Sequence, residues 1–340
     1  MAISPSSTTM SANSVIPKAT AISPVGWLRQ NRYALVLPAL FVFALLVFAI
    51  MAPDFFSLNN QLNVSRQAVY LLLVTLAQLI VLVGGGIDLS VGTIVALSSI
   101  VGAMTMSGLY QDGAGSPAWA ICAGAFAAVV VGGLVGLING IGAAVLRIPS
   151  FMMTLGMSSV VFGIALFLSG GVPIDGLPPE FGEVFGYGTL LGIPVPVVVM
   201  IGSIALVYVL LEWTRYGRHL YAIGGNMRAA MLSGVRTARV TVIAFVLSGM
   251  LSALSGVLLT ARLNTGESSI GVSFPLESIA ACVIAGAALT GGVGRTLAVV
   301  AGTFLIVFVQ NGMNLMQVGA YAQTMIVGAM LIFAMAFSKK

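Results

Sequence analysis

Long apolar runs, separated by short polar stretches, fill most of this chain. Ten of the runs come close to the ~20 residues that a helix needs to cross the hydrocarbon core of a bilayer. They lie at about 33–52, 64–84, 88–109, 117–146, 150–170, 193–213, 236–262, 275–291, 295–315 and 320–337. The pattern predicts an all-α polytopic membrane protein of about ten transmembrane helices, some broken at glycine-rich segments, in a single domain over 33–340.

The composition argues against a soluble globule. Charged residues make up 7% of the 340 residues, against roughly a quarter in an ordinary soluble domain. The net charge of +5 does not indicate nucleic-acid binding, because the basic residues lie in loops and at membrane edges. Residues 1–32 are rich in Ser, Thr, Ala and Pro, and we expect them to form a disordered cytoplasmic tail.

The distribution of Lys and Arg gives the bundle an orientation, since cytoplasmic loops are enriched in both residues. With ten spans and both termini in the cytoplasm, the cytoplasmic side holds all 14 basic residues except Arg66 and Arg262. The longest and most basic cytoplasmic loop covers about 214–238. The longest external loop, about 170–192, is rich in Pro and Gly and suits an irregular or short-helical cap.

A glycine-rich segment, VLVGGGIDLSVG (81–92), lies between the second and third runs. Gly85 and Gly86 free the backbone there, and Asp88 and Ser90 can cap the helix that follows. Broken helices at membrane depth often line a substrate path, but a capped turn at the cytoplasmic side explains the same residues. A second segment, CVIAGAALTGGVGR (282–295), loosely repeats the pattern, and one loose match assigns it no function.

Side-chain amides within the apolar runs form another candidate group. They are Gln78, Asn139, Gln310, Asn311 and Asn314. Such amides either hydrogen-bond neighbouring helices or line a path for a polar, uncharged solute. On the second interpretation, Asn139, Asn311 and Asn314 join the four residues of the glycine-rich break as candidate translocation-pathway residues.

The basic loop at 214–238 contains a predicted short helix, MRAAMLS. Asn226 suits its N-cap and Gly234 its end. Met227, Ala230 and Met231 share one face by their i, i+3, i+4 spacing and predict an exposed apolar surface. This surface, with arginines beside it, either docks into a groove of a partner protein or lies on anionic lipid.

Several kinds of chemistry find no support in the sequence. The chain has no phosphate-binding loop of the GxxxxGK[ST] type, so we do not expect it to bind ATP by that route. One histidine and two cysteines give no metal-ligand spacing, and we predict neither a metal nor another cofactor in this chain. The sequence shows no combination of a nucleophile and a base that would suggest an enzyme. Paired intramembrane carboxylates, which an ion-coupled pump would use, are also missing.

The chain contains five segments in a fixed order: GGGIDLSVG (84–92), NGIGAAVLRIPSFMMTLGM (139–157), YGRHLYAIGGNMRAAMLSGV (216–235), LESIAACVIAGAALTGGVG (276–294) and NGMNL (311–315). Together they resemble the permease subunits of ATP-binding-cassette sugar importers of the ribose/galactose/xylose type. The resemblance covers about residues 33–337. The chain departs from the usual family pattern at Ala285–Gly286, Glu277–Ser278 and Arg295.

This resemblance implies a subunit that translocates a monosaccharide, a pentose or hexose, or a sugar-like solute across a bacterial inner membrane. It implies a homo- or heterodimer of permeases on cytoplasmic ATP-binding subunits, fed by a periplasmic solute-binding protein that docks on the external loops near Asp175, Glu180 and Glu183. The segment coupled to the ATPase would contain Gly224, Gly225, Asn226, Arg228, Ala229, Ala230 and Gly234. From the residues alone, an ion-coupled secondary transporter of a small polar solute is the alternative.

Overall fold

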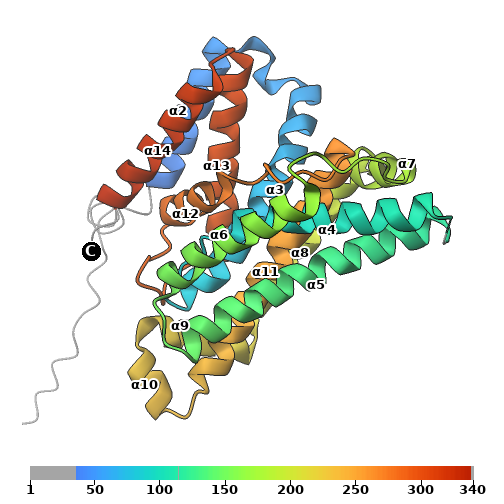
Figure 1. The fold of residues 1–340 in the computed structure, drawn as a ribbon. Helices are drawn as coiled ribbons and strands as arrows, with labels where there is room; N and C mark the ends of the chain where they lie inside the picture. The colour runs from blue at the N-terminus through green and yellow to red at the C-terminus, as the bar shows by residue number, and fades with distance from the viewer. Residues whose placement is uncertain (1–35, 114, 338–340) are drawn as a thin grey trace, which may run out of the picture.

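The computed structural model describes residues 36–113 and 115–337, and this part of the chain is almost entirely helical (Figure 1). Each of the ten apolar runs forms a helix. These are α2 (Val36–Met51), α3 (Leu58–Val83), α4 (Val91–Gln111), α5 (Pro117–Ala144), α6 (Ser150–Ser169), α8 (Val195–Tyr208), α11 (Thr237–Leu263), α12 (Phe274–Ile284), α13 (Thr296–Leu315) and α14 (Ala320–Phe337). The protein is therefore an all-α polytopic membrane protein, as predicted; the tail predicted for 1–32 lies outside the described residues.

Seven of the described helices are long and apolar enough to cross a membrane: α3, α4, α5, α6, α8 with its continuation η4, α11 and α13. The π-helical turn η4 (Val209–Trp213) extends α8 to a largely apolar helix of 19 residues. The apolar helices α2, α12 and α14 are shorter. The eighth run, expected at 275–291, stops being helical at Ile284, because the glycines that follow allow the backbone to leave the helix.

Short elements fill the two longest loops. The loop predicted to be external contains α7 (Pro179–Phe181), the π-helical turn η3 (Gly182–Gly186) and a hairpin of β1 (Thr189–Leu190) and β2 (Ile193–Pro194). Its strands pair antiparallel, with Thr189 opposite Pro194. The basic loop contains α9 (Arg215–Gly225) and α10 (Met227–Leu232), and a 3-10 turn η2 (Pro53–Phe56) joins α2 to α3. Both predictions, a short-helical cap and a short loop helix, are confirmed.

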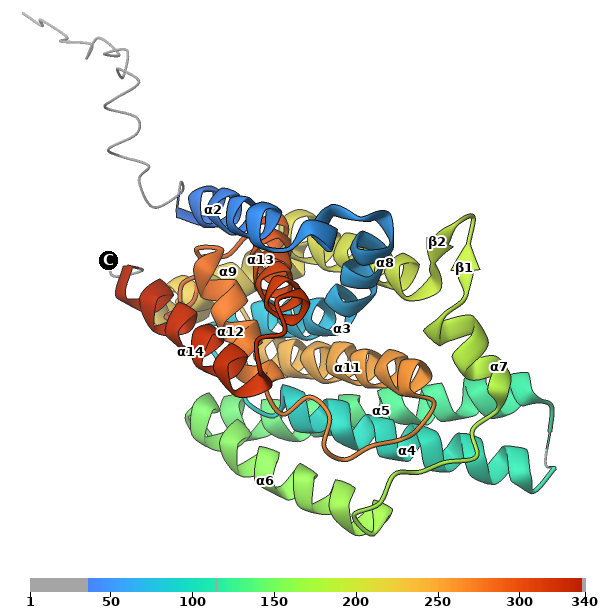
Figure 2. The same ribbon diagram turned by 90° about the horizontal axis from the view of Figure 1, so that it is seen from above.

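Helix α11 lies in the middle of the molecule, with α4, α5 and α6 on one side and α3 and α13 on the other (Figure 2). It contacts α3, α4 and α5. Small residues let α5 approach it closely: a Cβ at Gly132 would lie 2.5 Å from both the Gly249 oxygen and the Ala253 Cβ. The glycines of α5 and α11 thus serve helix packing.

The loops between spans gather at two ends of the bundle. At the end that carries α9 and α10 (Figure 1), the Ile87 amide donates to Ser150 Oγ (3.1 Å) and the Gly292 amide donates to the Val83 oxygen (2.9 Å). At the other end, Ile174 and Gly266 exchange two backbone hydrogen bonds of 2.8 and 2.9 Å. This grouping agrees with the alternation of loops that ten spans require, and the sidedness remains the prediction from charge.

Candidate functional site

The break between α3 and α4 is a tight turn that buries a carboxylate. Gly85 has φ +83°, a left-handed conformation that favours glycine, and the Gly86 amide donates to the Val81 oxygen at 3.0 Å. The Asp88 carboxylate is fully buried and accepts hydrogen bonds from the Ser90 amide (3.0 Å), Ser90 Oγ (2.6 Å) and Ser248 Oγ (3.0 Å). The three donors offset its loss of hydration.

The predicted capping role of this pair needs a correction. Helix α4 begins at Val91, not at 88, so Asp88 closes the turn before the helix instead of capping it. Ser90 occupies the N-cap position but makes no side-chain capping bond there; its hydroxyl donates to Asp88 and accepts from Asn139 instead. Asp88 therefore ties the break to α11 through Ser248.

The candidate pathway residues fall into two separate groups. Asn139 in α5 donates from Nδ2 to Ser90 Oγ at 2.8 Å and so joins the buried cluster around Asp88. Asn311 instead pairs with Asn60 through two amide hydrogen bonds of 2.8 and 3.0 Å, near the opposite end of α13 from the break. Asn314, further along the same helix, accepts from Gln323 (2.7 Å).

Their burial bears on the pathway role. Asp88, Ser90 and Asn139 have no exposed surface and Asn311 is 3% exposed, so none of the four borders open space in a single copy of the chain. Three of them form one hydrogen-bonded cluster, in which the buried Asn139 Oδ1 has no partner, and the fourth links α13 to α3. A pathway role for this set remains a prediction.

The basic loop folds as two consecutive helices. Thr214 caps α9 by accepting from the Gly217 amide (3.2 Å), and Asn226 caps α10 by accepting from the Ala229 amide (3.0 Å). Gly234 follows α10 with φ +84°. The predicted cap and stop are therefore confirmed.

The predicted docking face of α10 is wrong at one residue. Ala230 is 5% exposed and packs into the main core cluster. Met227 and Met231 remain exposed, at 49% and 56%, and Leu232 is 90% exposed. The reason is tertiary, since residues of the main core cluster that come from other elements cover Ala230. The exposed apolar surface of α10 consists of Met227, Met231 and Leu232.

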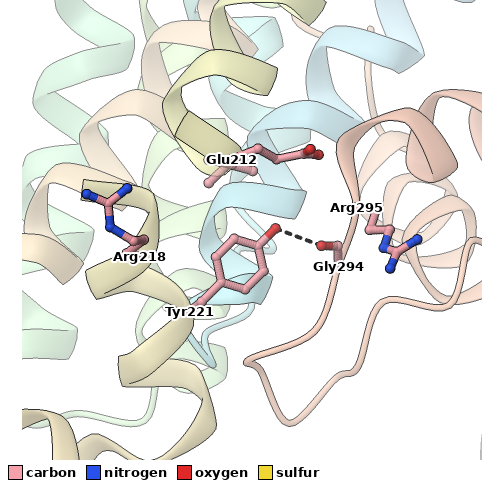
Figure 3. A pocket seen from close by; sticks show the side chains of 6 residues that line it. Glu212, Arg218, Tyr221, Gly294 and Arg295 are labelled. Atoms are coloured by element: carbon pink, nitrogen blue, oxygen red, sulfur yellow. Dashed lines mark hydrogen bonds between the residues drawn. The ribbon is translucent and has the colours of Figure 1, made fainter. Parts of the chain in front are cut away.

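Helix α9 contacts the second glycine-rich break directly (Figure 3). The Tyr221 hydroxyl donates to the Gly294 oxygen at 2.7 Å, beside a cavity of about 450 Å³ that Glu212, Arg218 and Arg295 also line. Burial raises the pKa of Tyr221, and the nearby Glu212 carboxylate adds to the effect while Arg295 opposes it. The hydroxyl therefore keeps its proton and remains a donor at neutral pH.

Sequence reasoning missed three residues of this region. Gly291 and Gly292 lie against Gly85 and against Gly224–Gly225, so the two glycine-rich breaks meet beside α10. The loose repeat at 282–295 was the one signal for these glycines. Nothing local in the sequence marks Tyr221.

Ten apolar helices, two of them ending at glycine breaks, and a basic helical loop at one end define a membrane transport subunit. The chain belongs to the permease component family of branched-chain amino acid transport systems, whose model matches residues 60–335.

Curated relatives extend along nearly the whole chain. The ribose import permease protein RbsC of Bacillus subtilis is 38% identical over 303 residues, which cover 88% of this chain and 91% of the relative. The L-arabinose ABC transporter permease protein AraH of Azospirillum brasilense is 32% identical, with 99% and 96% covered. The D-allose transport system permease protein AlsC of Escherichia coli is 33% identical, with 88% and 90% covered. No solved structure matches the chain.

Proposed function

We propose that this chain is the transmembrane subunit of an ATP-binding-cassette importer that carries a monosaccharide, or a sugar-like solute, across the bacterial inner membrane. The observation that carries the proposal is its full-length similarity to permeases named for ribose, L-arabinose and D-allose. The chain itself contributes no covalent chemistry. It would move the solute by changing between inward- and outward-facing states that its partners favour in turn.

We propose three kinds of partner from the similarity to import permeases and from the missing ATP-binding motif. With no phosphate-binding loop in the sequence, ATP would be bound by a separate cytoplasmic subunit. A second permease subunit, identical or similar, would complete the path, and a periplasmic binding protein would deliver the solute. The ion-coupled alternative is not favoured, because the similar proteins are named as sugar import and ABC transporter permeases.

Helix α10 is the proposed docking element for the ATP-binding subunit. Three apolar side chains, Met227, Met231 and Leu232, are exposed on a six-residue helix that projects from one end of the bundle (Figure 1). Arg228 is exposed beside them. Flexible Met side chains on a short helix suit a hydrophobic groove of a protein partner.

Co-purification in mild detergent tests this assignment. We expect an ATP-binding subunit, identified by mass spectrometry and ATP hydrolysis, to be recovered with the wild type and lost with Met231→Glu, which places a charge on the exposed surface. Leu191→Glu is the matched control, since Leu191 is 96% exposed in the loop at the other end. Equal recovery with Met231→Glu and the control would contradict docking through α10.

The solute is tested by uptake. Cells that lack the gene, complemented with the wild type, should accumulate at least one of labelled ribose, L-arabinose and D-allose, and should depend on ATP for it. Uptake that follows an ion gradient with ATP depleted would contradict the importer assignment.

A further inference from the structure

Five glycines bring three distant backbone segments into contact at the end of the bundle that carries α10. They are Gly85 of the α3–α4 break, Gly224 and Gly225 at the end of α9, and Gly291 and Gly292 of the α12–α13 break. We call this contact the glycine junction. The Gly292 amide fixes it by donating to the oxygen of Val83, the last residue of α3, at 2.9 Å.

The contacts at the junction are between backbones. A Cβ at Gly291 would lie 2.6 Å from Gly85 Cα and 2.9 Å from Gly224 Cα, and one at Gly292 would lie 2.8 Å from Gly225 Cα. A Cβ at Gly224 would collide with the Val83 oxygen and the Gly292 nitrogen. Real Cβ atoms essentially never come within 3.0 Å of such neighbours, so no residue with a side chain fits at these positions.

Three of the glycines also need a conformation that other residues rarely adopt. Their φ angles are +83° at Gly85, +92° at Gly291 and +76° at Gly292. The positions that need a left-handed backbone and those that have no room for a side chain therefore lie together, where the two breaks turn.

The junction links the proposed docking helix to the parts of the bundle that would have to move. Gly224 and Gly225 immediately precede Asn226, the cap of α10. Gly85 lies in the break that Asp88 ties to Ser248 of α11, and Tyr221 of α9 holds the Gly294 oxygen just before α13. The junction therefore gives α10 a path to α3, α11 and α13 through backbone contacts and short hydrogen bonds, in addition to its direct packing on α11.

We propose that the glycine junction is the positioning element that transmits displacement of α10 to both helix breaks during transport. Flexible side chains absorb small displacements by changing rotamer, whereas backbones in contact must move together or separate. The proposal rests on the proposed function, in which α10 docks on the ATP-binding subunit. Gly291 and Gly292 then have a role in coupling, and Gly225 has a smaller one because its own Cβ position is open.

Two glycines, one inside and one outside the junction, provide the test. A Cβ at Gly224 meets two backbone atoms, while a Cβ at Gly202, in α8, meets nothing within 4 Å. In proteoliposomes with the ATP-binding subunit and binding protein, we expect Gly224→Ala to retain the ATP-binding subunit but to lose transport by about tenfold or more. Its ATP hydrolysis should no longer respond to the solute-loaded binding protein. Gly202→Ala should transport within about twofold of the wild type.

Close packing without transmission predicts a different result. Gly224→Ala would then either transport like Gly202→Ala, or lose transport and recovery of the ATP-binding subunit together through misfolding. The first result overturns the proposal. For the second, hydrogen exchange of the wild-type complex, with and without ATP, decides the question.

In that exchange experiment, ATP should change protection at 222–226, at 84–87 and at 290–294 together. A change at 222–226 that leaves the two breaks unaffected would overturn the proposal. Failure of the wild type to recover any ATP-binding subunit would instead refute the proposed function, and the coupling role of the junction with it.

Discussion

At the scale of single residues, the buried Asp88 carboxylate can serve the structure of the break, the transport of the solute, or both. Its carboxylate accepts three hydrogen bonds within 3.0 Å and has no exposed surface. A side chain at this position that cannot accept hydrogen bonds would leave those donors unpaired, and each buried unpaired donor costs about 1–3 kcal/mol. The residue is therefore structural at least in holding the break against α11.

Substitution separates the charge of Asp88 from its hydrogen bonds. We expect Asp88→Asn to stay close to wild-type thermal stability in detergent, because its carbonyl keeps both bonds from Ser90 and the Ser248 hydroxyl can turn to accept from the amide. Asp88→Ala should lower stability by about 2 kcal/mol or more, since it strands the donors. Normal stability of Asp88→Asn with abolished uptake would show that the charge itself acts in transport.

At the scale of elements, α10 depends on its cap more than on its length. A helix of six residues has little stability of its own, and Asn226 satisfies one of its free amides at 3.0 Å. We expect Asn226→Ala to cost about 1 kcal/mol locally, to speed hydrogen exchange at 227–232 and to reduce uptake. Asn226→Ser is the control because serine caps comparably. Equal exchange and uptake in both variants would contradict the role of the cap.

The elements also show what local patterns can and cannot predict. The length of the apolar runs located all ten helices, and Asn226 and Gly234 marked the ends of α10, because caps and stops act within a few residues. The same reasoning misplaced Ala230, whose side chain is buried by a core that the loop sequence does not contain. The glycine junction was out of reach for the same reason, since Gly85, Gly224 and Gly291 meet only through the tertiary fold.

At the scale of the whole molecule, the orientation of the bundle decides whether α10 can meet an ATP-binding subunit at all. The hairpin of β1 and β2 precedes α8, and α9 follows η4. The largely apolar helix between the two loops has 19 residues. Its length is about 28 Å, which matches the ~30 Å hydrocarbon core. The two loops should therefore lie on opposite sides, with the basic one in the cytoplasm.

Thiol labelling tests this orientation with one residue from each loop, Leu191 and Leu232, which are 96% and 90% exposed. Cys122 is exposed and is first replaced by serine, while Cys282 is buried. In cells with a permeabilised outer membrane, an impermeant maleimide should label Leu191→Cys directly and Leu232→Cys only after the inner membrane is broken. The reverse pattern would place α10 outside the cell, where no ATP-binding subunit could dock and the glycine junction would have no displacement to transmit.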